Sequence, residues 1–224
     1  MATESFGFTL RQAVGEADLH SACAVRAQAY ERQFPGARQK MLVPDEVDAC
    51  PSTTVYLCED KVSGDAVGTM RIQTTENGGT LEIEKYAKVP ADMKKHGRGE
   101  VTRLAAVPNA EVFVRLALWK AAYLHCLVSN IRWLILGVRR PSLLRSYTEM
   151  GACDITEPVA LPYAGDLIYR VLGLDVLSAE SDWQDRNHPL LNFMVATTHP
   201  DIYMPSMYRP RAVVDGFHEE VAVL

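Results

Sequence analysis

The segment at residues 99–104, Gly-Glu-Val-Thr-Arg-Leu, holds the strongest candidate for catalysis, Glu100. The segment has the pattern of a strand, in which side chains alternate between two faces. Glu100 and Thr102 are therefore predicted on one face, and Val101 and Arg103 on the other. A carboxylate inside a central strand is costly unless it is paired or faces a cleft. In a dry cleft its pKa rises, which suits a general base. The alternative interpretation is a structural ion pair.

A second group of polar residues precedes this strand: Arg26, Tyr30, Asp45, Asp48 and Arg71. Arg26 and Tyr30 are four residues apart in a predicted helix, so they share one helix face. Arg71 lies in a strand that is otherwise apolar at alternate positions. Each residue alone is more often a solvated or structural charge, so only the combination indicates a site.

The elements that must position these residues follow from periodicity. Strands are predicted at residues 8–14, 53–59, 66–74, 99–107, 133–138 and 167–174, and helices at residues 16–34, 111–129 and 142–150. Pro141 and Gly151 set the limits of the last helix. This order predicts an α/β fold with a mixed, mostly antiparallel twisted sheet flanked by helices. Residues 1–174 are assigned to one domain, and residues 175–224 to a C-terminal extension packed on it.

The ordered set Arg26-x3-Tyr30, Asp45-x2-Asp48, Gly68-x2-Arg71 and Glu100-x2-Arg103 resembles the acyl-homoserine lactone (autoinducer) synthases. In that family the same residue types, in this order and at these spacings, form a charged cluster on the substrate side. The resemblance covers residues 8–107, and residues 107–174 resemble the GNAT N-acyltransferases more generally. The N-acyl amino acid synthases share both features, including a segment like residues 100–104. The resemblance implies a GNAT-like fold and transfer of an acyl chain to an amine.

Three departures separate this chain from the autoinducer synthases. Tyr30 stands where they usually have Phe, the Trp that follows a few residues later is missing, and residues 73–78 lack their Pro-Thr and Pro-Tyr-Met-Leu pattern. These departures favour an N-acyl amino acid synthase over a synthase that uses S-adenosylmethionine.

The connection at residues 107–112, Val-Pro-Asn-Ala-Glu-Val, bears on the acyl donor. Acetyl-CoA-dependent GNAT enzymes have a glycine-containing loop here, whose N–H groups bind the pyrophosphate. This connection has no glycine and includes the acidic Glu111. We therefore expect an acyl-phosphopantetheine thioester on acyl carrier protein as donor and partner, with CoA as the other possible carrier. No tightly bound cofactor is expected.

Within this hypothesis, Glu100 accepts the proton of the attacking amine, directly or through one water. Arg71 or Arg103 binds the acceptor carboxylate. The other residues expected to bind substrate are Arg26, Tyr30, Asp45 and Asp48. The thioester oxyanion is expected to bind backbone N–H groups of Leu104, Ala105 and Ala106.

Composition excludes several other classes. The 224 residues carry a net charge of −5, which argues against a protein that coats nucleic acid. Five cysteines without a CxxC pair, and the scattered His188, His199 and His218, predict reduced thiols and no metal site. No signal peptide is recognised, and charges interrupt the most apolar stretch, residues 112–136. A soluble, cytoplasmic enzyme with a small-molecule amine acceptor is expected.

Two alternatives remain open. The first alternative is an autoinducer synthase that uses S-adenosylmethionine. The second is a non-catalytic GNAT-like module that binds an acylated carrier. A plain acetyl-CoA acetyltransferase is disfavoured because the phosphate loop is missing.

Overall fold

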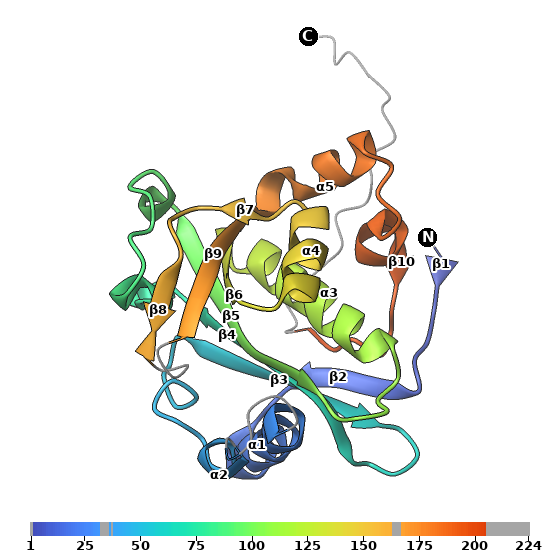
Figure 1. Ribbon diagram of the computed structural model, residues 1–224. Helices are drawn as coiled ribbons and strands as arrows, with labels where there is room; N and C mark the ends of the chain where they lie inside the picture. Colours follow the sequence, from blue (N-terminus) through green and yellow to red (C-terminus); the bar gives the residue numbers. More distant parts are fainter. Residues whose placement is uncertain (1, 32–35, 37, 163–166, 205–224) are drawn as a thin grey trace, which may run out of the picture.

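The computed structural model describes residues 2–31, 36, 38–162 and 167–204 (Figure 1). Its centre is a sheet in the order β2-β3-β4-β5-β6-β9-β7, with β8 also paired to β9. The parallel pair in this sheet is β5 with β6, and the other pairs are antiparallel. The predicted mixed, mostly antiparallel sheet is confirmed. Its strands are β2 (Phe8–Gln12), β3 (Thr53–Asp60), β4 (Ala66–Thr74), β5 (Gly97–Ala106), β6 (Ile131–Val138), β7 (Cys153–Asp154), β8 (Val159–Leu161) and β9 (Leu167–Asp175).

Helices cover both faces of the sheet. On one face lie α3 (Phe113–Val128), α4 (Pro141–Glu149) and α5 (Val176–Asp185), and on the other lie α1 (Gly15–Glu31) and the short α2 (Arg38–Met41) (Figure 1). The α3 helix packs on β4, β5 and β6, whereas α1 packs on β3, β4 and β5. The central strand β5 is therefore enclosed between two helices.

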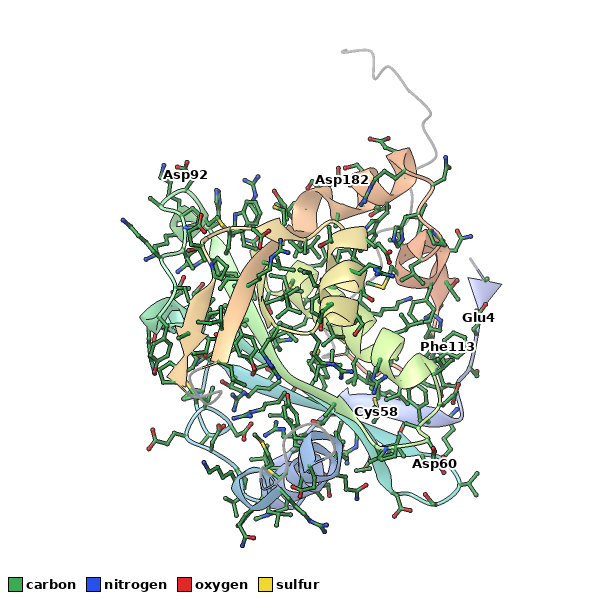
Figure 2. All side chains as sticks on the ribbon, viewed as in Figure 1. Glu4, Cys58, Asp60, Asp92, Phe113 and Asp182 are labelled. Atoms are coloured by element: carbon green, nitrogen blue, oxygen red, sulfur yellow. The ribbon has the colours of Figure 1, made fainter. Side chains whose placement is uncertain are left out.

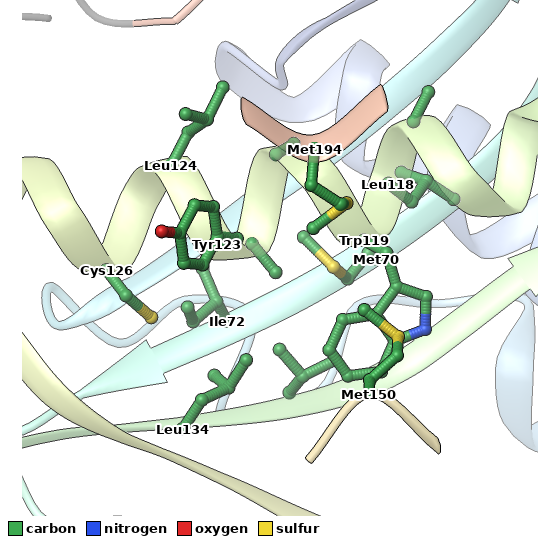
Figure 3. Packing of buried hydrophobic residues seen from close by; sticks show 14 of the residues in the cluster. Met70, Ile72, Leu118, Trp119, Tyr123, Leu124, Cys126, Leu134, Met150 and Met194 are labelled. Atoms are coloured by element: carbon green, nitrogen blue, oxygen red, sulfur yellow. The ribbon is translucent and has the colours of Figure 1, made fainter. Parts of the chain in front are cut away.

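The main hydrophobic core lies between α3 and the sheet. Trp119 and Tyr123 of α3 meet Met70 and Ile72 of β4, and Met150 reaches the same layer from the end of α4 (Figure 3). Every residue of α3 from 117 to 126 is buried, so the middle of this helix is covered on all sides rather than along one apolar stripe.

The opposite face of the sheet has two smaller apolar clusters. Residues of α1 cover Val55 and Leu57 of β3, and a connection between β4 and β5 covers Ile135 of β6 and Val171 of β9. That connection contains the single 3-10 turns η1 (Glu76–Gly78), η2 (Ile83–Lys85) and η3 (Met93–Lys95). It closes one side of the sheet over Glu100.

The structure corrects several predicted boundaries. The β5 and β6 strands begin two residues earlier than predicted, and β2 ends two residues earlier. The elements α2, β7 and β8 were not predicted, because they are too short to show a clear periodicity. The predicted helix end at residues 32–34 lies outside the described residues.

Residues 175–204 pack beside α3. Lys120 of α3 is buried, and its ammonium donates to the carbonyl oxygens of Phe193 at 2.7 Å and Thr197 at 2.6 Å. Thr197 belongs to β10 (Thr197–Thr198), which pairs in parallel with β1 (Ala2–Thr3). Near these strands, the ring of Phe113 at the start of α3 stacks on that of Phe6 at 6.0 Å between centroids (Figure 2 labels Phe113). Among the described residues, no helix is long and apolar enough to cross a membrane.

Candidate active site

The β5 strand has a bulge at Arg103. Thr69 of β4 pairs with Ala105, and Arg71 pairs with Thr102, so two residues of β5 lie opposite the single residue between them in β4. Arg103 takes up the extra length in a left-handed backbone conformation, with φ of 55°. Such a bulge re-aims the side chains that follow it.

The bulge overturns the predicted alternation of faces. Arg103 was expected on the face of Val101, but its guanidinium donates to Asp45 at 3.3 Å. Asp45 in turn contacts Arg71, which donates from Nε to the Thr102 hydroxyl at 2.9 Å. Arg103 therefore joins the face of Thr102 because the extra residue shifts the alternation by one position.

The structure brings five of the predicted residues into one charged cluster: Arg26, Asp45, Asp48, Arg71 and Arg103. Arg26 donates to Asp48 at 2.7 Å, and both side chains are almost completely buried. Burial by itself raises the pKa of Asp48, but the hydrogen bond and charge of Arg26 and the charge of Arg71 outweigh it. The net result is a pKa below the usual range, so Asp48 stays ionised.

The cluster has a buried part and an open part. The Arg71 side chain is 4% exposed and contacts Thr102, Asp45 and Asp48. By contrast, the Asp45 side chain is 40% exposed and that of Arg103 is 18% exposed. A ligand can therefore reach Arg103 and Asp45 first.

A cavity of about 640 Å³ lies beside the cluster, where β5 and β6 separate. The pairing of these parallel strands ends at Val101 and Leu136, while β5 continues to Ala106. In the described part of the chain, β5 therefore has no ladder partner on its β6 side beyond this point. The lining includes the predicted residues Tyr30, Leu104, Ala105 and Ala106, and also Ala29, Val107, Pro108, Asn109, Ala110, Glu111, Val112, Arg115, Arg140, Ser142, Leu143 and Tyr147.

The connection from β5 to α3 forms one wall of this cavity without a glycine. Asn109 adopts a left-handed conformation with φ of 68°, which Asn tolerates better than most residues. The Glu111 carboxylate accepts the Gly7 N–H at 3.2 Å. Two exposed cations, Arg115 of α3 and Arg140 before α4, also line the cavity. The site therefore offers guanidinium groups, rather than a glycine loop, to a phosphate.

Tyr30 links the cavity to the cluster. It lies in the last turn of α1, four residues after Arg26, and lines the cavity. Burial raises the pKa of Tyr30, although the nearby charge of Arg103 opposes that shift. The phenol is therefore neutral at physiological pH.

Tyr147 is a cavity residue that sequence reasoning missed. It projects from α4, and its ring packs edge-on against Trp119 at 4.9 Å between centroids. Burial raises the pKa of Tyr147 to about 12. The sequence signal was the helix start at Pro141, which places residue 147 two turns into a helix that begins where β6 ends. The same signal could have indicated Arg115 and Arg140, since each lies near the start of a helix that follows a central strand.

Glu100 lies on the same face as Thr102 and Arg71, two residues before Thr102 in β5 and opposite Gln73 of β4. It is 1% exposed, and its carboxylate accepts the N–H of Ile83 in η2 at 2.9 Å. Glu100 is not among the described residues that line the cavity. Thr102 does not line the cavity either, so Glu100 has no direct access to this space through its own side chain.

The described residues contain no group of three or more His, Cys, Asp or Glu side chains that could hold a metal ion. The five cysteines are free thiols, three of them buried.

Splayed parallel strands, a bulge in the central strand and a cavity at the point of separation define a GNAT-like fold. Solved structures with this fold include FeeM, an N-acyl amino acid synthase from uncultured soil microbes. It is 17% identical, with a TM-score of 0.62 over 84% of this chain and 97% of FeeM. BjaI, a CoA-dependent acyl-homoserine lactone synthase, is 15% identical, with a TM-score of 0.56 over 86% of this chain and 93% of BjaI. FdhC, a nucleotide-linked sugar GNAT, is 10% identical, with a TM-score of 0.54 over 84% of this chain and 97% of FdhC. Comparison of the sequence with protein-family models and with curated proteins finds no match.

Proposed function

We propose that this protein is an N-acyltransferase that moves a fatty acyl chain from a phosphopantetheine thioester to the amine of an amino acid-like acceptor. The observation that carries the proposal is the contact between two compartments. The cavity at the separated ends of β5 and β6 is lined by Leu104, which follows Arg103 in β5, and by Tyr30, whose pKa is affected by the nearby charges of Arg103 and Arg26. A thioester in the cavity and a charged acceptor at the cluster would therefore meet beside the same strand.

The cavity is suited to a donor with a single phosphodiester. Arg115 and Arg140 offer two guanidinium groups at its wall, and a guanidinium matches phosphate geometry in a bidentate manner. Arg139 and Arg145 are also exposed and flank Arg140 in the sequence, so this segment is basic although the whole chain is acidic. This charge distribution supports acyl carrier protein as the donor and partner, with CoA as the alternative carrier.

The acceptor side is suited to a carboxylate. Arg71 is buried and already donates to Thr102 and two carboxylates, whereas Arg103 is more exposed, so we assign the carboxylate clamp to Arg103 rather than to Arg71. The half-exposed Asp45 lies next to it and offers an acceptor for an ammonium group. An α-amino acid presents both charges.

The chemistry needs a base, an oxyanion site and a proton for the leaving thiolate. Glu100 is the proposed base, and it acts through Thr102 or a water molecule. Leu104, Ala105 and Ala106 line the cavity, and their backbone N–H groups are the proposed donors to the thioester oxygen. Tyr147 is protonated at neutral pH and lines the same cavity, so it is the proposed proton donor to the thiolate.

An autoinducer synthase is the second candidate, because the cluster that forms in the structure contains the residue types on which that resemblance rests. The same cluster could bind the amino acid portion of S-adenosylmethionine. The departures at Tyr30 and at residues 73–78 place this candidate second.

One experiment separates the candidates. Purified protein is incubated with decanoyl-acyl carrier protein or decanoyl-CoA, together with a panel of amino acids or with S-adenosylmethionine, and products are identified by mass spectrometry. N-decanoyl amino acid supports the proposal, and decanoyl-homoserine lactone supports the second candidate. Tight binding of decanoyl-acyl carrier protein with turnover at background would identify a non-catalytic module.

A further inference from the structure

Tyr30 occupies the place where acyl transfer would occur under the proposed function. It shares the cavity wall with Leu104 and Ala105, the β5 residues just after the bulge. On its other side is Arg26, one helical turn earlier in α1 and part of the charged cluster. Tyr30 therefore lies between the cavity proposed for the donor and the cluster proposed for the acceptor.

The protonation state of the phenol fixes what it can do. Burial raises its pKa, and the guanidinium groups of the cluster oppose this shift only in part. A neutral phenol supplies one O–H donor and an oxygen that accepts. A group that remains protonated cannot take a proton from the amine, but it can donate a hydrogen bond to developing negative charge.

We propose that the Tyr30 hydroxyl donates a hydrogen bond to the thioester oxygen during acyl transfer, beside the backbone N–H groups of β5. This inference rests on the proposed function and adds a side-chain donor to the oxyanion site. A hydroxyl placed on the α1 side of the cavity approaches that oxygen from a different wall than the strand does. Two donors from separate elements fix the position of the oxyanion.

The step balances as follows. The neutral amine attacks the thioester carbonyl carbon, a C–N bond forms, and the π electron pair moves to oxygen, which accepts the Tyr30 hydrogen bond. The amine loses one proton to the base. The oxygen pair returns, the C–S bond breaks, and the thiolate takes a proton from Tyr147. The base then releases its proton to solvent and Tyr147 takes one up from solvent, which restores both groups. The products are an amide and a free thiol, and Tyr30 keeps its proton throughout.

The test is Tyr30→Phe, which removes the oxygen and keeps the ring. Because loss of one oxyanion donor reduces kcat by about 100-fold or more, we expect that loss in acyl transfer from decanoyl-acyl carrier protein. KM for donor and acceptor should stay within about twofold, because the bond strengthens only in the transition state. Tyr203→Phe is the matched control, since Tyr203 is exposed and lies outside the cavity lining.

A second substrate separates the two phenols. An acyl ester of a thiophenol releases a weakly basic thiolate that needs no proton. With this substrate the defect of Tyr147→Phe should shrink, whereas the defect of Tyr30→Phe should persist because the oxyanion still forms. Thermal unfolding of each variant checks that the fold is retained.

The outcomes are distinguishable. If Tyr30→Phe keeps wild-type kcat, or if its defect disappears with the thiophenol ester, the oxyanion role of Tyr30 is wrong and the proposed function survives. If kcat is unchanged and the acceptor KM rises, Tyr30 is a binding residue instead. If the wild-type protein transfers no acyl group to any amine, both the proposed function and this inference fail.

Discussion

The substitution Asp48→Asn tests the charged cluster most directly. The Asp48 side chain is 1% exposed and accepts hydrogen bonds from Arg26 at 2.7 Å and from the Asp45 N–H at 3.1 Å. A second guanidinium, that of Arg71, lies at 3.3 Å. The variant removes the negative charge and leaves two buried cations with less compensation.

The magnitude follows from this burial. Breaking a buried ion pair by removing one partner costs about 3–5 kcal/mol, because the remaining charge stays desolvated. For a chain of this size each kcal/mol lowers Tm by about 2–4 °C, so a decrease of roughly 6–20 °C is expected. Acyl transfer should fall as well, since Arg71 loses one of its two carboxylate partners.

The assay is chemical and thermal unfolding of wild type, Asp48→Asn and the control Asp154→Asn. Asp154 pairs with Arg170 at the surface, where both side chains are more than 40% exposed. An exposed pair contributes about 0–1 kcal/mol, so the control should differ little from wild type.

The pH dependence of stability provides a second test of the cluster. The folded-state pKa of Asp48 is depressed, so its stabilisation is present above the unfolded-state pKa and is lost as pH falls through the folded-state value. The free energy of unfolding of Asp48→Asn should therefore lack the acid-dependent contribution that Asp48 makes in the wild type. If the two variants lose equal stability, or if Asp48→Asn keeps the wild-type acid profile, the account of the cluster as a buried charge network is refuted.

Three further predictions follow from the site and the core. Glu100→Gln should lower kcat by about 100-fold or more if Glu100 is the base, while the amide oxygen still accepts the Ile83 N–H and preserves the fold. Arg103→Ala should raise the acceptor KM by about tenfold or more, since a charge-assisted hydrogen bond contributes about 1.5–3 kcal/mol; initial rates measure this. Burial lowers the pKa of His125 to about 4, so its neutral form is favoured in the fold. As pH falls from about 6.5 to 4 the unfolded chain takes up a proton more readily, and about 3 kcal/mol of stability should be lost; urea titrations of wild type and His125→Gln measure the difference.

Each of these predictions has a contradicting result. Activity of Glu100→Gln within about tenfold of wild type would exclude general-base catalysis by that residue. An unchanged acceptor KM in Arg103→Ala would move the carboxylate clamp elsewhere. Equal acid sensitivity of His125→Gln and wild type would assign the loss of stability to other groups.

The order of elements could be predicted from the sequence because it depends on local patterns. Alternation identified β3 and β4, a helical apolar stripe identified α3, and Pro141 marked the start of α4. The absence of glycine between β5 and α3 could also be seen in the sequence, and the left-handed Asn109 shows how the chain turns without one. Short strands such as β7 carry too little pattern and depend on β9 for their existence.

The sequence by itself determined the class of fold and the set of charged residues that gather at β5, because both follow from residue types in a fixed order. Only the tertiary structure decided the geometry of the site. Arg103 joins Asp45 because the pairing of β4 with β5 forces a bulge, and Tyr147 and Arg140 enter the cavity because β6 leaves β5 at that point. Strand register and strand separation are set by contacts between residues distant in the chain, and no local pattern encodes them.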